Sequence, residues 1–66
     1  MHILLVEDDI QIAEALCAAL SLENFTVDHV STAAAAEHAL VLGHFDALVL
    51  DLGLPDEDGL SLLQRL

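Results

Sequence analysis

Two short apolar runs in the sequence are each followed directly by acidic residues. The segment Glu7–Asp9 comes after the run Ile3–Val6, and Asp51 comes after the run Ala47–Leu50. Two carboxylates about 4 Å apart repel each other by roughly 4 kcal/mol at an effective dielectric near 20. If these acids meet in the fold, a bound proton or a hard divalent cation must offset that repulsion. Mg2+ suits a wet site with two or three carboxylates, because it retains several of its waters.

The elements that position these acids are indicated by the apolar pattern. Both apolar runs lack alternation, which is typical of strands covered on both faces of a parallel sheet. Between them, Ile12, Leu16 and Leu20 recur every four residues and predict one face of a helix. Asp9 is the expected N-cap of this helix, which should end before Asn24.

A second strand and a second helix are expected in the middle of the chain. The segment Phe25–Val30 mixes β-branched and polar residues, which favours a partly exposed edge strand. A helix is expected over Ala33–Leu42, with Ser31 and Thr32 as candidate caps. Gly43 is expected to close this helix in a left-handed conformation, as glycines at helix ends often do.

Chain breakers separate the last strand from a third helix. Gly53, Pro55 and Gly59 predict a loop, and Leu60 and Leu63 follow at helical spacing. The resulting order βαβαβα, with right-handed crossovers, predicts an α/β fold with a doubly wound parallel sheet. If the second strand lies outside the first, in the order 2-1-3, the first and third strands are neighbours and their terminal acids converge at the ligand-binding edge of the sheet. Any one of these acids could equally be a helix cap or a strand end, but the whole set favours a site.

The residues at this edge resemble a known family. The segments ILLVEDD at Ile3–Asp9 and LVLDLGLPDEDGLSLL at Leu48–Leu63 resemble the bacterial response-regulator receiver domain. They are most similar to the OmpR/PhoB-type branch, in which a receiver is joined to a winged-helix DNA-binding domain. The pairs Leu54-Pro55 and Asp58-Gly59 stand where that family has its loop after the phosphoacceptor. The resemblance implies a flavodoxin-like (CheY-like) fold, with residues 1–66 forming the N-terminal part of one receiver domain.

The resemblance also implies roles for particular residues. Asp51 would accept a phosphoryl group from the phosphohistidine of a sensor histidine kinase and form an acyl phosphate. Asp8 would bind Mg2+ directly, Glu7 would be the second acid of the pair, often acting through water, and Asp51 would complete the side-chain ligands. The backbone carbonyl of Gly53 would be a further ligand, and Asp9 would remain a helix cap. A protein of this kind controls a transcription regulator and is not expected to be an enzyme.

Charge and hydropathy limit the partners. The formal net charge is −11 with a single basic residue, Arg65, so direct binding of nucleic acid by this segment is not expected. DNA would be contacted only through a C-terminal domain outside these 66 residues. No apolar stretch approaches the roughly 18 residues of a membrane span, which favours a cytoplasmic protein without membrane contact.

Other metal sites fit the sequence poorly. A calcium loop that includes Asp56 and Asp58 fails, because its twelfth position would be Arg65. The four histidines form no i, i+4 pair and have no cysteine partner, so a zinc site is not expected.

Two alternatives to the phosphoacceptor remain at this point. The receiver family has a phosphate-sensing Ser or Thr, a phosphate-pairing Lys and further helices that would follow Leu66, and the chain contains no Lys. A half-receiver without these groups is expected to expose the edge of its third strand and to self-associate there, without phosphoryl-transfer activity. An independent magnesium-dependent hydrolase is the third candidate, but the sequence offers no second acid–base group for it.

Overall fold

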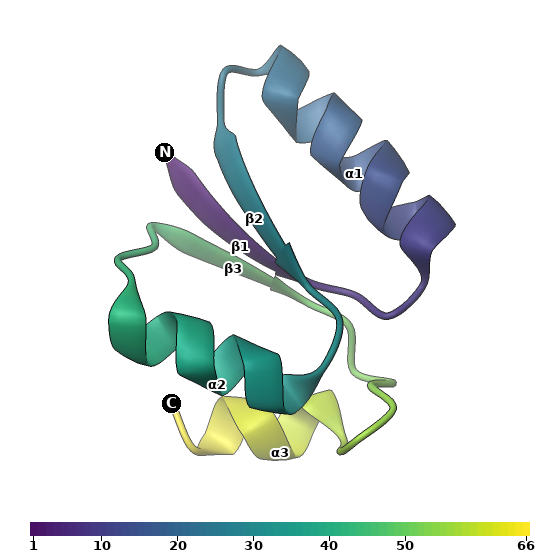
Figure 1. The fold of residues 1–66 in the computed structure, drawn as a ribbon, viewed down its shortest axis with the longest axis vertical. Coiled ribbons are helices and arrows are strands. Elements are labelled where there is room, and N and C mark those ends of the chain that lie inside the picture. The colour runs from purple at the N-terminus through teal and green to yellow at the C-terminus, as the bar shows by residue number, and fades with distance from the viewer.

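Strands and helices alternate along the chain in the order that the apolar pattern predicts. The computed structural model describes all 66 residues (Figure 1). Its elements are β1 (His2–Val6), α1 (Ile10–Leu22), β2 (Thr26–Val30), α2 (Ala33–Leu42), β3 (Ala47–Leu50) and α3 (Gly59–Gln64). No helix has both the length and the apolar composition needed to cross a membrane.

The three strands form one parallel sheet in the order β2-β1-β3, which confirms the predicted order 2-1-3. Strand β1 is central, and all four residues of the run Ile3–Val6 are buried, which explains why that run has no polar alternation. The outer strand β2 is partly exposed, as its mixed composition predicts. Val6 is aligned with Val30 of β2 and with Leu50 of β3. The three strands therefore end together, at one edge of the sheet.

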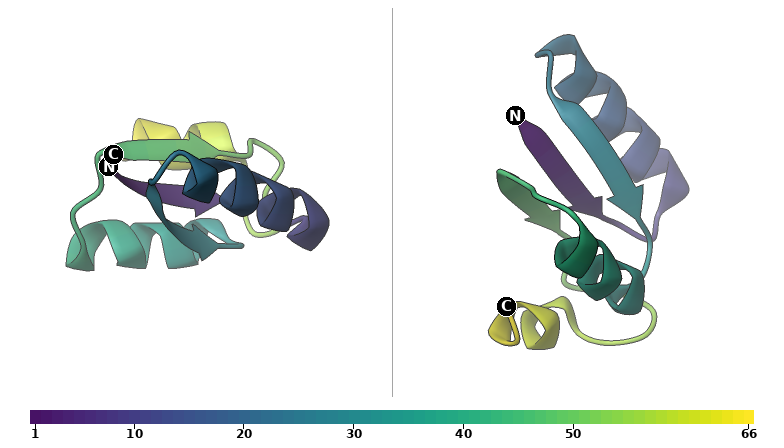
Figure 2. Two further views of the ribbon diagram at one scale, coloured as in Figure 1. Left: turned by 90° about the horizontal axis from the view of Figure 1, so that it is seen from above. Right: turned by 60° about the vertical axis from the view of Figure 1, so that its left-hand side comes forward.

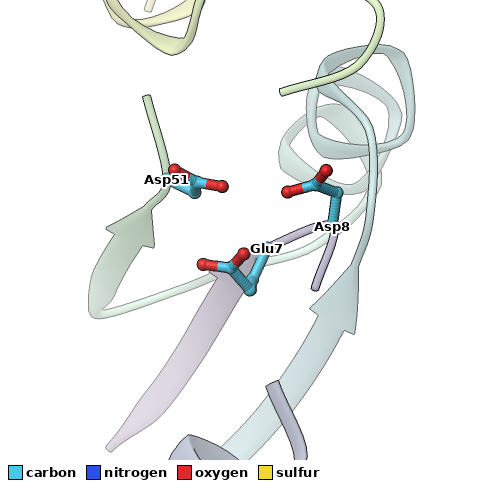
Figure 3. Close-up of side chains that lie close together, drawn as sticks. All are labelled: Glu7, Asp8 and Asp51. Atoms are coloured by element: carbon cyan, nitrogen blue, oxygen red, sulfur yellow. The ribbon is translucent and has the colours of Figure 1, made fainter. Parts of the chain in front are cut away.

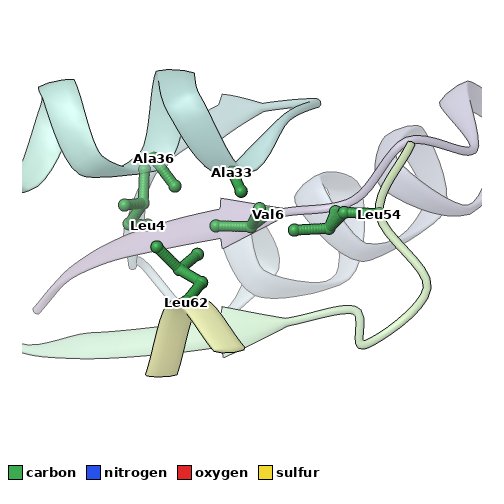
Figure 4. Close-up of a cluster of buried hydrophobic side chains, with 6 residues drawn as sticks. All are labelled: Leu4, Val6, Ala33, Ala36, Leu54 and Leu62. Atoms are coloured by element: carbon green, nitrogen blue, oxygen red, sulfur yellow. The ribbon is translucent and has the colours of Figure 1, made fainter. Parts of the chain in front are cut away.

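The helices cover the two faces of the sheet unequally. Helix α1 packs on one face beside β2, while α2 and α3 lie on the other (Figures 1 and 2). The core on the second face contains six buried residues, drawn in Figure 4: Leu4, Val6, Ala33, Ala36, Leu54 and Leu62. The two alanines are fully buried, so α2 packs closely over β1.

The buried face of α1 differs from the predicted one. Ile12 is 49% exposed, and the buried residue is Ala13, with Leu16, Cys17 and Leu20 half-buried. The reason is that an α-helix has 3.6 residues per turn, so residues four apart rotate around the helix by about 40° at each step. A face defined by every fourth residue drifts away from the sheet, and Ile12 lies at the end that has drifted into solvent.

The helix ends confirm most of the predicted caps and correct one of them. Asp9 caps α1, Thr32 caps α2, and α1 ends at Leu22, before Asn24. The prediction for Gly43 was wrong: its φ of −121° and ψ of 172° are extended, not left-handed. Its N–H still donates to the Ala39 carbonyl, and the chain leaves the helix through this extended residue.

Candidate functional site

Three carboxylates converge at the edge where β1 and β3 end. Glu7, Asp8 and Asp51 each offer an oxygen, and these atoms lie within 4.8 Å of one another (Figure 3). The convergence follows from the sheet, because β1 and β3 are neighbours with Val6 opposite Leu50. Asp8 is exposed and the other two are partly exposed, so the site is wet. Three hard oxygen donors in a shallow site of this kind fit Mg2+.

Asp51 is held in its charged form. The N–H of Gly53 donates to Asp51 Oδ1 at 3.0 Å, and this hydrogen bond is the main cause that lowers the pKa of Asp51. Partial desolvation opposes the shift, and the adjoining Asp8 and Glu7 carboxyls lower the pKa further. The carboxylate of Asp51 is therefore favoured in its ionised form, as a nucleophile requires.

Glu7 is the residue of the cluster whose pKa is raised. The N–H of Asp9 donates to Glu7 Oε1 at 3.1 Å and by itself lowers the pKa of Glu7. Partial desolvation and the neighbouring Asp51 and Asp8 carboxylates outweigh that bond and leave the pKa of Glu7 raised. The raised pKa of Glu7 means that the cluster favours a proton there, and a divalent ion would compete with it.

The backbone of Glu7 is fixed by the neighbouring strand β2. Its N–H donates to the Val30 carbonyl at 3.1 Å, and its carbonyl accepts from His29 Nε2 at 2.7 Å. His29, an exposed residue of the edge strand β2, thus helps to position the acidic pair, a contact that the sequence did not indicate. Asp9 lies outside the cluster, and its Oδ1 accepts from the N–H groups of Gln11 and Ile12, which confirms its predicted role as a cap.

The segment after Asp51, residues 52–58, forms a tight loop, which we call the Asp51 loop. Gly53 forms an isolated antiparallel bridge with Asp58, and Gly59 N–H donates to the Leu52 carbonyl at 2.9 Å. Asp58 also caps α3 by accepting from Leu60 N–H. Gly53 therefore lies beside Asp51, while the use of its carbonyl as a metal ligand stays a prediction.

Asp56 has a role that the sequence did not indicate. Its Oδ1 accepts from Ala33 N–H at 2.9 Å and its Oδ2 from Ala34 N–H at 3.0 Å, at the start of α2. These two bonds are the main causes that lower the pKa of Asp56. A cap supplied from more than 20 residues away leaves no local spacing signal. An acid directly after Pro55 in a loop is, however, a feature that could have suggested a capping role.

Arg65 joins the same two regions of the chain. Its guanidinium donates to Glu57, in the Asp51 loop, and to Glu37 Oε1 of α2 at 2.5 Å. The contact with Arg65 lowers the pKa of Glu57, and both glutamates raise the pKa of Arg65. These ion pairs are partly exposed, so each contributes little stability by itself.

The fold and the site together define a class of protein. A parallel sheet of order 2-1-3 with acids at the carboxyl ends of its first and third strands is the arrangement of flavodoxin-like α/β proteins. Residues 3–66 match the family described as the response regulator receiver domain, and the chain belongs to this family. The resemblance inferred from the sequence is thereby confirmed.

Curated relatives match the chain along its whole length. It is 50% identical over 66 residues to the transcriptional regulatory protein BasR of Escherichia coli (strain K12) and to the response regulator protein PmrA of Pseudomonas aeruginosa. It is 54% identical over 63 residues to the swarming motility regulation protein RssB of Serratia marcescens. The match covers 100% of the chain but 30% of BasR and of PmrA, so the chain spans less than a third of their length.

Solved structures confirm the fold. A sensor protein from Polaromonas sp. JS666 superimposes with a TM-score of 0.94 at 40% identity, over 98% of this chain and 52% of the other. A CheY-like response regulator receiver domain from Methylobacillus flagellatus also gives a TM-score of 0.94, at 35% identity, over 98% of this chain and 55% of the other. Nearly all of this chain therefore superimposes on these two structures, and it corresponds to about half of the length of each.

Proposed function

We propose that the chain is the phosphoacceptor region of a two-component response regulator, with Asp51 as the acceptor. The observation that carries this proposal is the convergence of Glu7, Asp8 and Asp51 at one edge of the sheet, with Asp51 kept ionised by Gly53. The donor would be the phosphohistidine of a sensor histidine kinase. An Asp51 oxygen attacks phosphorus, the P–N bond breaks with its electron pair leaving on the imidazole, and an acyl phosphate forms.

The acidic cluster would hold Mg2+ for this step. Asp8 and Asp51 are the candidate direct ligands, Glu7 would act through water, and the Gly53 carbonyl would complete the protein ligands. Bound Mg2+ would supply positive charge to neutralise the three carboxylates and the incoming phosphoryl oxygens. The chain's own contribution is to hold Asp51 ionised and in place.

Transcription control is the proposed role of the whole protein. BasR is named a transcriptional regulatory protein and PmrA a response regulator protein, and both are much longer than this chain. The net charge of −11 disfavours contact between these 66 residues and DNA. We therefore assign any DNA contact to a region outside them.

Phosphoryl uptake tests the proposal directly. The chain is incubated with acetyl phosphate, with Mg2+ or with a chelator, and its intact mass is measured. A single phosphoryl adduct that requires Mg2+ would support the proposal. Mg2+ binding without an adduct would mean that these 66 residues are not sufficient for the transfer.

Asp8→Ala is expected to weaken Mg2+ binding by about tenfold or more. Loss of one carboxylate next to a divalent ion removes at least about 1.4 kcal/mol of attraction, which corresponds to a tenfold change in affinity. Isothermal titration calorimetry gives the affinity, and Glu14→Ala on the exposed side of α1 is a control with the same change in charge. Equal affinities for Asp8→Ala and the wild type would remove Asp8 from the site.

A second candidate function is self-association through the edge of β3, without phosphoryl chemistry. In this chain β3 pairs only with β1, so its other edge is open, and Val49 on β3 is 38% exposed. An open apolar strand edge is a template for another strand. Leu52, Leu60 and Leu63, in the loop and helix that follow β3, are also about half exposed.

Sedimentation equilibrium tests this candidate. The mass of the chain is expected to rise with concentration, and Val49→Lys is expected to shift it toward the monomer, because a charge on an edge strand opposes pairing. A monomer at every concentration would exclude self-association.

A further inference from the structure

The amino terminus of α2 is capped by two residues, one directly before the helix and one more than 20 residues after its start. The first amides of a helix have no partner within it. Thr32 Oγ1, in the cap position, accepts from Ala35 N–H at 3.1 Å. The two amides before that one, of Ala33 and Ala34, each donate to a different oxygen of Asp56. Asp56 thus binds α2 with both carboxylate oxygens, in hydrogen bonds strengthened by its charge and by the helix dipole.

Asp56 belongs to the Asp51 loop, so its bonds to α2 fix that loop as well as the helix. The two ends of the loop are already held: Gly53 N–H bonds to Asp51, and Asp58 caps α3. Leu54, 8% exposed, packs into the core cluster with Val6 and Ala33 (Figure 4). Asp56 is the polar contact that fixes the middle of the loop to the start of α2.

A second link runs parallel to this one but is weaker. Arg65 joins Glu57 of the loop to Glu37 of α2 through exposed ion pairs, which water and salt screen. Asp56 instead satisfies two backbone amides that have no other protein partner. Its lowered pKa agrees with a carboxylate stabilised in its charged form.

We propose that Asp56 is a positioning residue for the phosphoacceptor site, because it fastens the Asp51 loop to the amino terminus of α2 and so holds Gly53 beside Asp51. This inference rests on the proposed function, since it concerns the same site. The loop carries both groups that depend on its position: the Gly53 N–H that donates to Asp51 Oδ1 and the Gly53 carbonyl that is the candidate metal ligand. Without Asp56 the loop keeps its end contacts, the packing of Leu54 and the exposed ion pair between Glu57 and Arg65.

The experiment compares three variants that separate positioning from charge and from helix stability. Asp56→Ala removes the charge and both acceptors, whereas Asp56→Asn removes the same charge but keeps one side-chain oxygen that can accept a bond. Thr32→Ala removes the other cap of α2 and leaves the loop untouched. Mg2+ affinity is measured by calorimetry under conditions in which circular dichroism shows every variant to be folded.

Asp56→Ala is expected to weaken Mg2+ binding about fivefold, the change in an equilibrium constant that loss of a helix cap produces. Asp56→Asn is expected to recover part of that loss despite its equal charge. Thr32→Ala is expected to lower the midpoint of thermal unfolding but to leave the Mg2+ affinity unchanged. Equal weakening in Asp56→Ala and Asp56→Asn would mean a charge effect only, and equal weakening in Asp56→Ala and Thr32→Ala would mean a stability effect only. Either result overturns the proposal.

A measurement without metal keeps the inference separate from the proposed function. In the metal-free chain, Asp56→Ala is expected to shift the amide resonance of Gly53 and to speed the hydrogen exchange of Ala33 and Ala34. Thr32→Ala should leave the Gly53 resonance in place. If the wild type binds no Mg2+ but these shifts occur, the metal site fails and the positioning role stands. An unshifted Gly53 resonance in Asp56→Ala would overturn the positioning role whether or not metal binds.

Discussion

Asp51→Asn is expected to abolish phosphoryl uptake while leaving the fold intact. An amide is not a nucleophile toward phosphorus under these conditions, so the acyl phosphate cannot form. The asparagine side chain of the variant is nearly the same size, and its oxygen can still accept the Gly53 N–H that binds Asp51 Oδ1 in the wild type. Removing one of three clustered charges also lowers their mutual repulsion. Intact mass after incubation with acetyl phosphate and Mg2+ should show an adduct on the wild type and none on the variant.

The wild type and the variant must be measured side by side. An adduct that persists on Asp51→Asn would place the phosphoryl group on another residue and contradict the proposed function. Circular dichroism of both chains checks that the loss of the adduct does not come from unfolding. If neither chain gains an adduct although Mg2+ binds, the transfer needs groups outside these 66 residues.

The sheet and the acidic cluster could be predicted because they depend on short, local patterns. The unbroken apolar runs that became β1 and β3 indicate strands covered on both faces, and each is followed at once by acid. Alternation of strands and helices then indicates a parallel sheet, and Glu7, Asp8 and Asp51 come together once the first and third strands are neighbours, as they are in the structure. The family resemblance added the assignment of Asp51 as the acceptor, which geometry alone does not give.

The contacts that support the site could not be predicted, because they join residues far apart in the chain. His29 on β2 reaches the Glu7 carbonyl at the end of the neighbouring strand β1, and Asp56 caps a helix that begins 23 residues earlier. An acidic side chain can cap a helix, pair with a cation or face solvent. The sequence alone does not show which of these three roles it has. Gly43 shows the same limit, since whether a helix ends in a left-handed turn depends on where the chain goes next.

Gly59→Ala is expected to destabilise the chain, although the same change in a helix usually stabilises it. Gly59 is buried at the first position of α3, where alanine should be better than glycine by up to about 1 kcal/mol. A Cβ on Gly59, however, would lie 2.6 Å from the Asp51 carbonyl oxygen and 2.8 Å from the Leu52 Cα. Both are backbone atoms at the site, so relieving the overlap must move the Asp51 loop. Such overpacking costs about 1–3 kcal/mol, a large share of the stability of so small a domain.

Urea unfolding followed by circular dichroism measures this effect, and Gly53→Ala is its matched control. A Cβ on Gly53 would meet only Asp51 Oδ1, at 3.8 Å, and no glycine in the chain has a positive φ. Its free energy of unfolding should therefore change by less than about 0.5 kcal/mol. Since Gly59 approaches the backbone of Asp51, its alanine variant should also weaken Mg2+ binding in the fraction that remains folded. A free energy of unfolding for Gly59→Ala equal to or above that of the wild type would show that the backbone after Asp51 can move aside at little cost. The close contact between Gly59 and Asp51 would then not fix the site.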